Sequence, residues 1–271
     1  MIYTRKEYKE KYLKIKEDYL TGNYLLYELS EKYNIKYPAI SKFLKKEGFI
    51  INSNNKFPIN DNIFEEINTP EKAYWLGFLY ADGYIGLRKK QNTYTYSIEL
   101  SLKKSDLDHI ESFKKFLNSF HKINYREKLK AYRFVFSSRK IGEDLIKLGC
   151  IQNKSLILKF PTEEQVPKYL INHFIRGYFD GDGCINDPEK YPITLSLMGT
   201  FEFLKELLKQ MNIETKIRKT KSKAFDFAIS GDKARLFLKN LYENNNICLE
   251  RKYNRFIKHL ENIKNYNGRK K

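Results

Sequence analysis

The chain repeats itself after 100 residues. The segment EKAYWLGFLYADGYI contains Asp82 and is matched by INHFIRGYFDGDGCI, which contains Asp182, and 182 − 82 = 100. In each copy, runs with apolar residues at every second position alternate with runs of helical spacing. Each copy is therefore interpreted as helix, two strands, helix, two strands and helix. This order predicts an α+β protein built from two similar halves.

The predicted strands have one apolar and one polar face. In the first copy, Ile98 and Leu100 would face a core, while Ser97 and Glu99 would face the other way. The periodic runs are strands at 94–102, 122–129 and 131–138 with helices at 105–120 and 139–149, and strands at 192–199, 214–220 and 223–230 with helices at 200–211 and 232–242.

Residues 1–50 have the outline of a helix-turn-helix segment. Leu25, Leu26 and Leu29 recur at helical spacing, Asn34 suits a sharp corner, and Pro38 suits the first turn of the next helix. Its second helix would present Lys36, Tyr37, Ser41 and Lys42 to DNA, although helical hairpins that only cap a domain are also common. The expected organisation is this segment, a linker at 51–66, a first repeat at 67–160, and a second repeat at 161–271 that includes a C-terminal helix.

The charge of the chain requires a polyanionic partner. Lys and Arg number 51 against 33 Asp and Glu, which gives a net charge of +18, and 41% apolar residues are enough for a folded core. Three widely separated cysteines favour neither a disulfide framework nor a zinc site. We expect a cytoplasmic protein with no membrane partner, because no apolar run has the length of a membrane span and the N-terminal residues lack the apolar stretch of a signal peptide.

Small residues mark one face of each opening helix. Ala73, Gly77 and Ala81 lie at i, i+4 and i+8, and Gly177 and Gly181 occupy the equivalent face of the second copy. Glycine inside a helix costs about 0.5–1 kcal/mol relative to alanine, so its presence favours close packing of the two helices.

Two acidic side chains are expected at the ends of these helices. Gly83 and Gly183 should end them in the left-handed conformation, which would leave Asp82 and Asp182 side by side. Two carboxylates and two negative helix ends repel one another, and a hard divalent cation, Mg²⁺ or Mn²⁺, would relieve this. A single Asp-Gly is usually a turn, but two at matched positions favour a metal site.

The sequences WLGFLYADG and IRGYFDGDG resemble the two signature helices of the LAGLIDADG homing endonucleases, in their single-chain form. The resemblance implies two pseudo-twofold αββαββα repeats that form a saddle-shaped DNA-binding sheet. It implies that Asp82 and Asp182 bind the metal, with the carbonyls of Ala81 and Gly181 nearby. Tyr80 departs from the pattern, since the second copy has an additional acid, Asp180, at that position.

Catalytic lysines are expected downstream of each repeat. Lys154 lies 72 residues after Asp82 and Lys252 lies 70 after Asp182, in segments that resemble the lysine region of the family. Lys159 and Arg251 are the nearest alternatives for these two roles, and isolated lysines in so basic a chain are often only solvated surface.

The polar strand faces are expected to bind DNA. Arginine suits guanine and asparagine suits adenine, whereas most lysines would contact phosphates. A solvated sheet face is the alternative for any one residue. The candidates are Tyr84, Arg88, Arg126, Lys128 and Arg133 in the first copy, and Asn186, Lys216, Arg218, Lys221 and Lys223 in the second.

The resemblance implies a monomeric, Mg²⁺-dependent endonuclease that cuts both strands of a long asymmetric DNA site and leaves 3′ overhangs. Two alternatives remain open: a regulator that binds DNA on the same fold without cutting it, and an intron maturase that binds folded RNA. We do not expect an intein, because no nucleophilic Cys or Ser follows Met1 and the chain ends in NGRKK.

Overall fold

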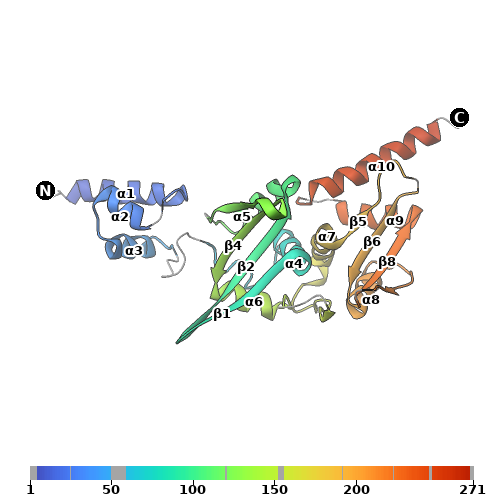
Figure 1. The fold of residues 1–271 in the computed structure, drawn as a ribbon, viewed down its shortest axis with the longest axis horizontal. Coiled ribbons are helices and arrows are strands. Elements are labelled where there is room, and N and C mark those ends of the chain that lie inside the picture. The colour runs from blue at the N-terminus through green and yellow to red at the C-terminus, as the bar shows by residue number, and fades with distance from the viewer. Residues whose placement is uncertain are drawn as a thin grey trace. The chain divides into compact units, whose positions relative to one another are not determined.

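Each repeat contributes a four-stranded antiparallel sheet and its helices to an α+β fold (Figure 1). The computed structural model describes residues 5–24, 26–49, 59–119, 121–151, 156–190, 192–221, 223–243 and 246–268. The backbone packs into two units, residues 1–63 with 88–140 and residues 64–87 with 141–271. The expected boundaries follow the repeats, whereas these units place the first motif helix with the second repeat. Both motif helices therefore belong to one unit.

Three helices at the N-terminal end surround a small core of their own. They are α1 (Arg5–Leu20), α2 (Leu26–Tyr33) and α3 (Tyr37–Lys46). Ile15, Leu29 and Ile40 are fully buried between them. The corner between α2 and α3 is at Asn34, whose φ of 50° lies in the left-handed region that asparagine tolerates, and a proline stands in the first turn of α3. The expected pair of short helices and the turn at Asn34 are confirmed.

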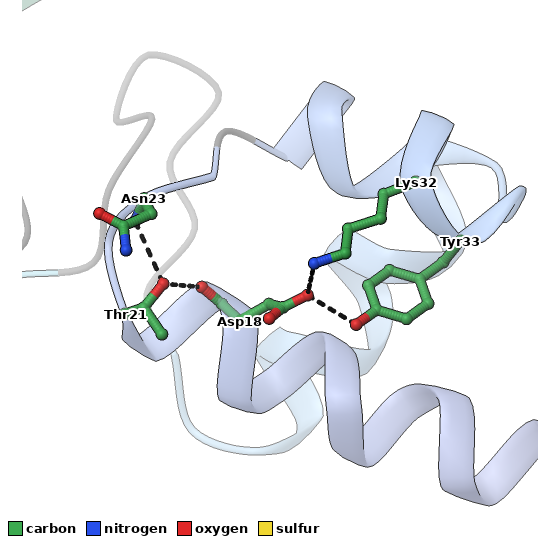
Figure 2. A network of polar contacts seen from close by, with 5 residues as sticks. All are labelled: Asp18, Thr21, Asn23, Lys32 and Tyr33. Atoms are coloured by element: carbon green, nitrogen blue, oxygen red, sulfur yellow. Dashed lines mark hydrogen bonds and ion pairs between the residues drawn. The ribbon is translucent and has the colours of Figure 1, made fainter.

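A polar network ties α1 to α2 (Figure 2). Asp18, near the end of α1, accepts hydrogen bonds from Lys32 Nζ at 2.7 Å and from the Tyr33 hydroxyl at 2.6 Å. Thr21 donates to the Asp18 carbonyl at 2.6 Å and accepts from the Asn23 amide at 3.3 Å. These contacts fix the turn that follows α1.

The first repeat has the strand order β1-β2-β4-β3. Phe136 pairs with Ile98 and Phe134 with Leu100 across β2 and β4, and all four side chains are buried. The core face predicted from the alternation is therefore confirmed. The elements are α4 (Pro70–Asp82), β1 (Gly83–Lys90), β2 (Thr93–Lys103), α5 (Leu107–Phe116), β3 (Ile123–Arg126), β4 (Ala131–Ser138) and α6 (Arg139–Lys147).

The second repeat has the same strand order, β5-β6-β8-β7. Its predicted alternation also holds, since Phe227 and Ile229 are buried and Asp226 lies on the opposite face, where it pairs with Arg218. The elements are α7 (Ile171–Asp182), β5 (Cys184–Ile185), β6 (Thr194–Gly199), α8 (Phe201–Gln210), β7 (Arg218–Lys219), β8 (Phe225–Ser230) and α9 (Gly231–Tyr242), followed by α10 (Glu250–Gly268).

Several predicted bounds differ from the structure. The helix expected at 105–120 is α5, which is shorter because a 3-10 turn, Lys104–Asp106, precedes it and because Asn118 adopts a positive φ just beyond its end. The strand expected at 214–220 contributes only the two residues of β7.

The second half of the expected linker is packed rather than free. The Asn60 amide donates to the Leu117 carbonyl at 3.0 Å, and buried Asp61 accepts from Ser138 Oγ at 2.6 Å. Residues 51–58 lie outside the described residues. Within the described ranges, no helix combines the length and apolar character needed to cross a bilayer.

Candidate active site

The two motif helices contact each other through glycine. α4 and α7 lie side by side (Figure 1). A Cβ atom added to Gly77 would lie 2.0 Å from the Phe174 carbonyl oxygen, and one added to Gly177 would lie 1.9 Å from that of Tyr74. Because non-bonded heavy atoms normally stay about 3.5–4.0 Å apart, alanine at either position would push the backbones apart. The predicted close packing of the two helices is confirmed.

Both helices end at the predicted aspartates, but the left-handed backbone predicted for the glycines that follow them is wrong. α4 ends at Asp82 and α7 at Asp182. Gly83 has φ −73° and Gly183 has φ −75°, so both are extended rather than left-handed. What requires glycine is space, since an added Cβ would lie 2.6 Å from the Leu79 carbonyl oxygen at Gly83 and 2.3 Å from the Phe179 ring at Gly183.

The two aspartates share their surroundings at the foot of this helix pair. Both residues are exposed. A Cβ atom on Gly181 would lie 2.3 Å from the Ala81 Cβ and 3.4 Å from Asp82 Oδ2, so the end of α4 abuts the end of α7. Burial, followed by the charge and hydrogen bond of Asp182 and the charge of Asp82, raises the pKa of the Tyr178 phenol well above its usual value. The buried Tyr178 phenol therefore interacts electrostatically with both carboxylates.

Sequence reasoning missed Tyr178. Its hydroxyl donates to the Met198 carbonyl at 2.9 Å, and the residue lies one turn before Asp182 on α7. The signal was available in the sequence, because the equivalent position 100 residues earlier is Phe78, which has no hydroxyl. The two halves of the site thus differ in polarity.

Lys252, from the first turn of α10, reaches the end of α7. Its Nζ donates to the Phe179 carbonyl at 2.8 Å and to the Gly181 carbonyl at 3.0 Å, and the residue is buried. Burial lowers the pKa of Lys252 to about 8, against the opposing effects of Asp180, Asp82 and Asp182. The Lys252 amine is therefore bound at the end of α7, where it interacts electrostatically with all three aspartates.

The other lysine candidates are placed differently. Lys154 lies outside the described residues. Lys159 and Arg251, the alternatives, are both exposed. Lys252, in contrast, has its amine on the last turn of a motif helix.

The oxygen atoms at the helix ends fit a hard divalent cation. Two carboxylates and the last-turn carbonyls of Ala81 and Gly181 are the ligand type that Mg²⁺ prefers while it retains several waters. One lone pair of the Gly181 carbonyl is engaged by Lys252. No group of three or more His, Cys, Asp or Glu side chains suited to a metal occurs in the described part of the chain, so the fit depends on two acids and backbone oxygens.

Four of the five DNA-binding candidates of the first repeat lie on strands, on the sheet face opposite its core. Tyr84 is 56% exposed, and Arg88 on the same strand donates to Ser97 Oγ at 3.0 Å. Arg133 forms a two-point ion pair with Glu99, so its guanidinium is already partly satisfied. Exposed Arg126 lies on β3, and exposed Lys128 lies in the 3-10 turn, Glu127–Leu129, that leads to β4.

The candidates of the second repeat are also divided between exposed and engaged side chains. Arg218 Nε pairs with Asp226 Oδ1 at 3.1 Å. The Asn186 side chain is engaged in its own loop, where it donates to the Lys190 and Pro192 carbonyls and accepts from the Thr194 amide. The remaining candidates are exposed, and the contacts just described do not involve them. They are Lys216, Lys221 and Lys223.

The expected DNA-facing residues, on α3 and at its N-cap, lie away from the small core. Lys36 and Lys42 are exposed, Tyr37 is 41% exposed and Ser41 is half-buried. Ile40 on the same helix is fully buried, so the helix separates a polar face from an apolar one.

The fold and the paired motif helices define the class of protein. The LAGLIDADG endonuclease family profile matches residues 75–148, and the LAGLIDADG-like domain profile matches residues 170–242. The chain belongs to the LAGLIDADG family, as a single chain that carries both motifs. The recognition made from the two motifs is confirmed, and so is the pair of αββαββα repeats.

Two curated relatives come from Methanocaldococcus jannaschii. One is an uncharacterized protein, 31% identical over 224 residues that make up 74% of each chain. The other is a DNA polymerase, 27% identical over 222 residues, which are 76% of this chain but only 12% of the polymerase.

Two solved structures share the fold. One is the LAGLIDADG homing endonuclease I-LtrWI bound to target DNA, with a TM-score of 0.50 and 14% identity over 73% of this chain and 92% of that one. The other is the meganuclease I-CpaMI bound to uncleaved DNA, with a TM-score of 0.50 and 13% identity over 74% of this chain and 93% of that one.

Proposed function

We propose that the chain is a site-specific endonuclease that cuts both strands of DNA with a divalent cation, Mg²⁺ or Mn²⁺, held by Asp82 and Asp182. The observation that carries the proposal is that these two exposed carboxylates end two helices that touch through glycine, within a basic member of the LAGLIDADG family. Both motifs are in one chain, which supports action as a monomer on a long asymmetric site.

The cation would be held by Asp82 and Asp182 together with the carbonyls of Ala81 and Gly181. A bound divalent cation would activate water and stabilise the leaving oxygen of a phosphodiester. The chain supplies the rest of the charge distribution. Lys252 holds a positive charge at the Gly181 carbonyl, where it would oppose the negative charge that develops on the phosphate. We assign the matching role in the first repeat to Lys154.

DNA would bind along the polar faces of the two sheets. Arg88, Arg126 and Arg133 can form paired hydrogen bonds with guanine, and Arg133 would exchange its Glu99 partner to do so. The exposed lysines would neutralise phosphates and add affinity that falls with salt. The candidates of this role are Tyr84, Arg88, Arg126, Lys128, Arg133, Asn186, Lys216, Arg218, Lys221 and Lys223.

The N-terminal helices would act as a helix-turn-helix that extends the contact with DNA. The polar face of α3 carries Tyr37, Ser41 and Lys42, with Lys36 at its N-cap, while its apolar face is buried against α1 and α2. A helix with this division can enter a major groove and present its polar face to base edges. Tethering this segment to the repeats would raise affinity through effective concentration.

The test is cleavage of DNA by the purified protein. The protein is incubated with Mg²⁺ and either a randomised DNA library or DNA from its native locus, and the ends are sequenced. We expect one long asymmetric site, two offset breaks with 3′ overhangs, and no cleavage in EDTA. The double variant Asp82→Asn/Asp182→Asn, prepared in parallel, controls for contaminating nucleases.

A matched control keeps the chemistry of the change but moves it away from the site. Asp187 is exposed between β5 and β6, and its Oδ1 accepts from the Glu189 amide at 3.0 Å, a bond that asparagine can keep. Asp187→Asn should cut at the wild-type rate. If wild-type protein binds a specific DNA but cuts none, a non-cleaving regulator is favoured instead. If it prefers RNA as salt rises, the maturase alternative is favoured.

A further inference from the structure

The two motif helices differ at two buried positions where only the second helix has a basic or an acidic residue. In α7 these are Arg176 and Asp180, which are 1% and 0% exposed. The equivalent residues 100 positions earlier in α4 are Leu76 and Tyr80. A buried charged pair one helical turn apart therefore exists in the second repeat, where the first repeat has an apolar residue and a neutral phenol.

Arg176 holds both ends of the segment that connects α9 to α10. Its Nη1 donates to the Leu241 carbonyl at 3.1 Å, in the last turn of α9. Its Nε donates to the Ile247 carbonyl at 2.9 Å, three residues before α10 begins. One guanidinium thus fixes the distance between the end of one helix and the approach to the next.

Asp180 holds the same segment through its carboxylate. Oδ2 accepts from the Leu249 amide at 2.7 Å, and Oδ1 accepts from the Tyr242 hydroxyl at 2.7 Å. Oδ2 also accepts from the Tyr74 hydroxyl of α4 at 2.8 Å. A buried carboxylate with three donors is strongly restrained in position, so it ties α4, the end of α9 and the start of α10 to α7.

Lys252 is joined to the restrained residue Leu249 by one helical turn. The Lys252 amide donates to the Leu249 carbonyl at 2.9 Å, so Leu249 begins the turn that carries the lysine. From there Lys252 Nζ reaches the Phe179 and Gly181 carbonyls. A shift of the Leu249 backbone would be transmitted to the amine over a single helical turn.

In the first repeat, the equivalent helix position makes a different contact. The Tyr80 hydroxyl donates to the Leu148 carbonyl at 2.5 Å, just after α6. The Tyr80 phenol donates one hydrogen bond there, whereas the Asp180 carboxylate accepts three, from a backbone amide and two hydroxyls.

We propose that Arg176 and Asp180 are positioning residues for Lys252, because together they bind the end of α9 and the residues just before α10 and so hold the lysine amine at the end of α7. This goes beyond the proposed function in assigning roles to two buried residues that are not among its metal-binding or DNA-binding candidates. Its catalytic consequence rests on that function, whereas its structural consequence does not.

The structural consequence is measured by residue-resolved amide hydrogen exchange on the whole chain without DNA. In Asp180→Asn and Arg176→Met, the amides of Leu249, Lys252 and Tyr253 should exchange roughly tenfold faster or more, because lost hydrogen bonds of a charged group favour local opening. Amides of α8 should be unchanged. Tyr80→Phe, the matched change in the first motif, should leave the Leu249 amide as protected as in the wild type.

Unchanged exchange at Leu249 and Lys252 in both variants would overturn the proposal. If either variant also loses protection in α8, its effect is not confined to the site, and Tyr242→Phe is measured instead. This change is milder, because it removes a single hydrogen-bond donor to Asp180. Faster exchange at Leu249 with α8 still protected then supports the proposal, and unchanged exchange contradicts it.

Cleavage kinetics separate positioning from a merely structural role. Asp180→Asn should lower kcat with little change in KM for DNA. In an enzyme that already carries Lys252→Met, adding Asp180→Asn should lower kcat by less than about threefold, because Asp180 acts through the lysine. Equal fold losses in both backgrounds would overturn the assignment. If the wild-type protein cuts no DNA, the proposed function fails, and the exchange result still decides whether Arg176 and Asp180 position Lys252.

Discussion

Exchanging one methyl group between the two motif helices should reveal how tightly they are packed beside the aspartates. In Gly181→Ala the new Cβ would lie 2.3 Å from the Cβ of Ala81, whereas carbon atoms pack at about 3.5–4.0 Å. The helix ends would have to separate by more than about 1 Å. Overpacking of this kind costs about 1–3 kcal/mol, against which alanine gains about 0.5–1 kcal/mol in helix propensity.

The reverse change, Ala81→Gly, creates the space that Gly181→Ala lacks. Alone it should cost about 0.5–1 kcal/mol of propensity. In the double variant the two propensity effects cancel and the overlap disappears. The interaction free energy is the effect of the double variant minus those of the two single variants. It should equal the overpacking cost with the opposite sign, about −1 to −3 kcal/mol.

Urea unfolding followed by tryptophan fluorescence provides the measurement. Trp75 is the single tryptophan of the chain, lies on α4 and is fully buried, so its emission reports on the unit that contains both motif helices. If the two single effects add to within about 0.5 kcal/mol, the packing between Ala81 and Gly181 is not as described.

Two further predictions concern acid stability and the N-terminal helices. Burial, aided by the charge of Lys114, lowers the pKa of His121 to about 4 from 6.5. The unfolded chain therefore binds a proton between pH 6.5 and 4 that the folded chain does not, so stability should fall by up to about 3 kcal/mol as the pH falls through this window. His121→Asn should remove this fall in urea unfolding monitored by circular dichroism, and a wild-type-like pH dependence in the variant would contradict it. In the second prediction, Lys36→Ala/Lys42→Ala should weaken binding to all DNA sequences similarly and reduce the slope of log K against log salt by about 2. An unchanged slope would show that α3 does not contact phosphates.

Much of the fold could be predicted because its signals are local or periodic. The strand at 131–138 coincides with β4, since alternation of apolar and polar residues is a direct record of a half-buried sheet. The 100-residue repeat predicted that β1 to β4 would have counterparts in β5 to β8. The tight packing of the motif helices followed from glycine and alanine at helical spacing, and the two aspartates at their ends followed from the repeat.

The parts that escaped prediction depend on contacts distant in sequence. Asp180 stood out only as an extra acid, because its partners Tyr74, Tyr242 and Leu249 are 106, 62 and 69 residues away. Spacing alone placed Lys252 among the candidates, but the carbonyls that it binds could not be known. Gly83 was interpreted through its tolerance of a left-handed backbone, when the close approach of the Leu79 carbonyl is what excludes a side chain.

The most direct test of the account is strand-resolved cleavage by two single variants. Asp82→Asn, Asp182→Asn and the control Asp187→Asn are assayed with Mg²⁺ on the selected target, and DNA binding is measured without metal. Each of the first two should slow double-strand cleavage by roughly a hundredfold or more, with binding largely retained, while the control cuts as the wild type does. Cleavage of both strands at the wild-type rate in either Asp82→Asn or Asp182→Asn would place the active site elsewhere.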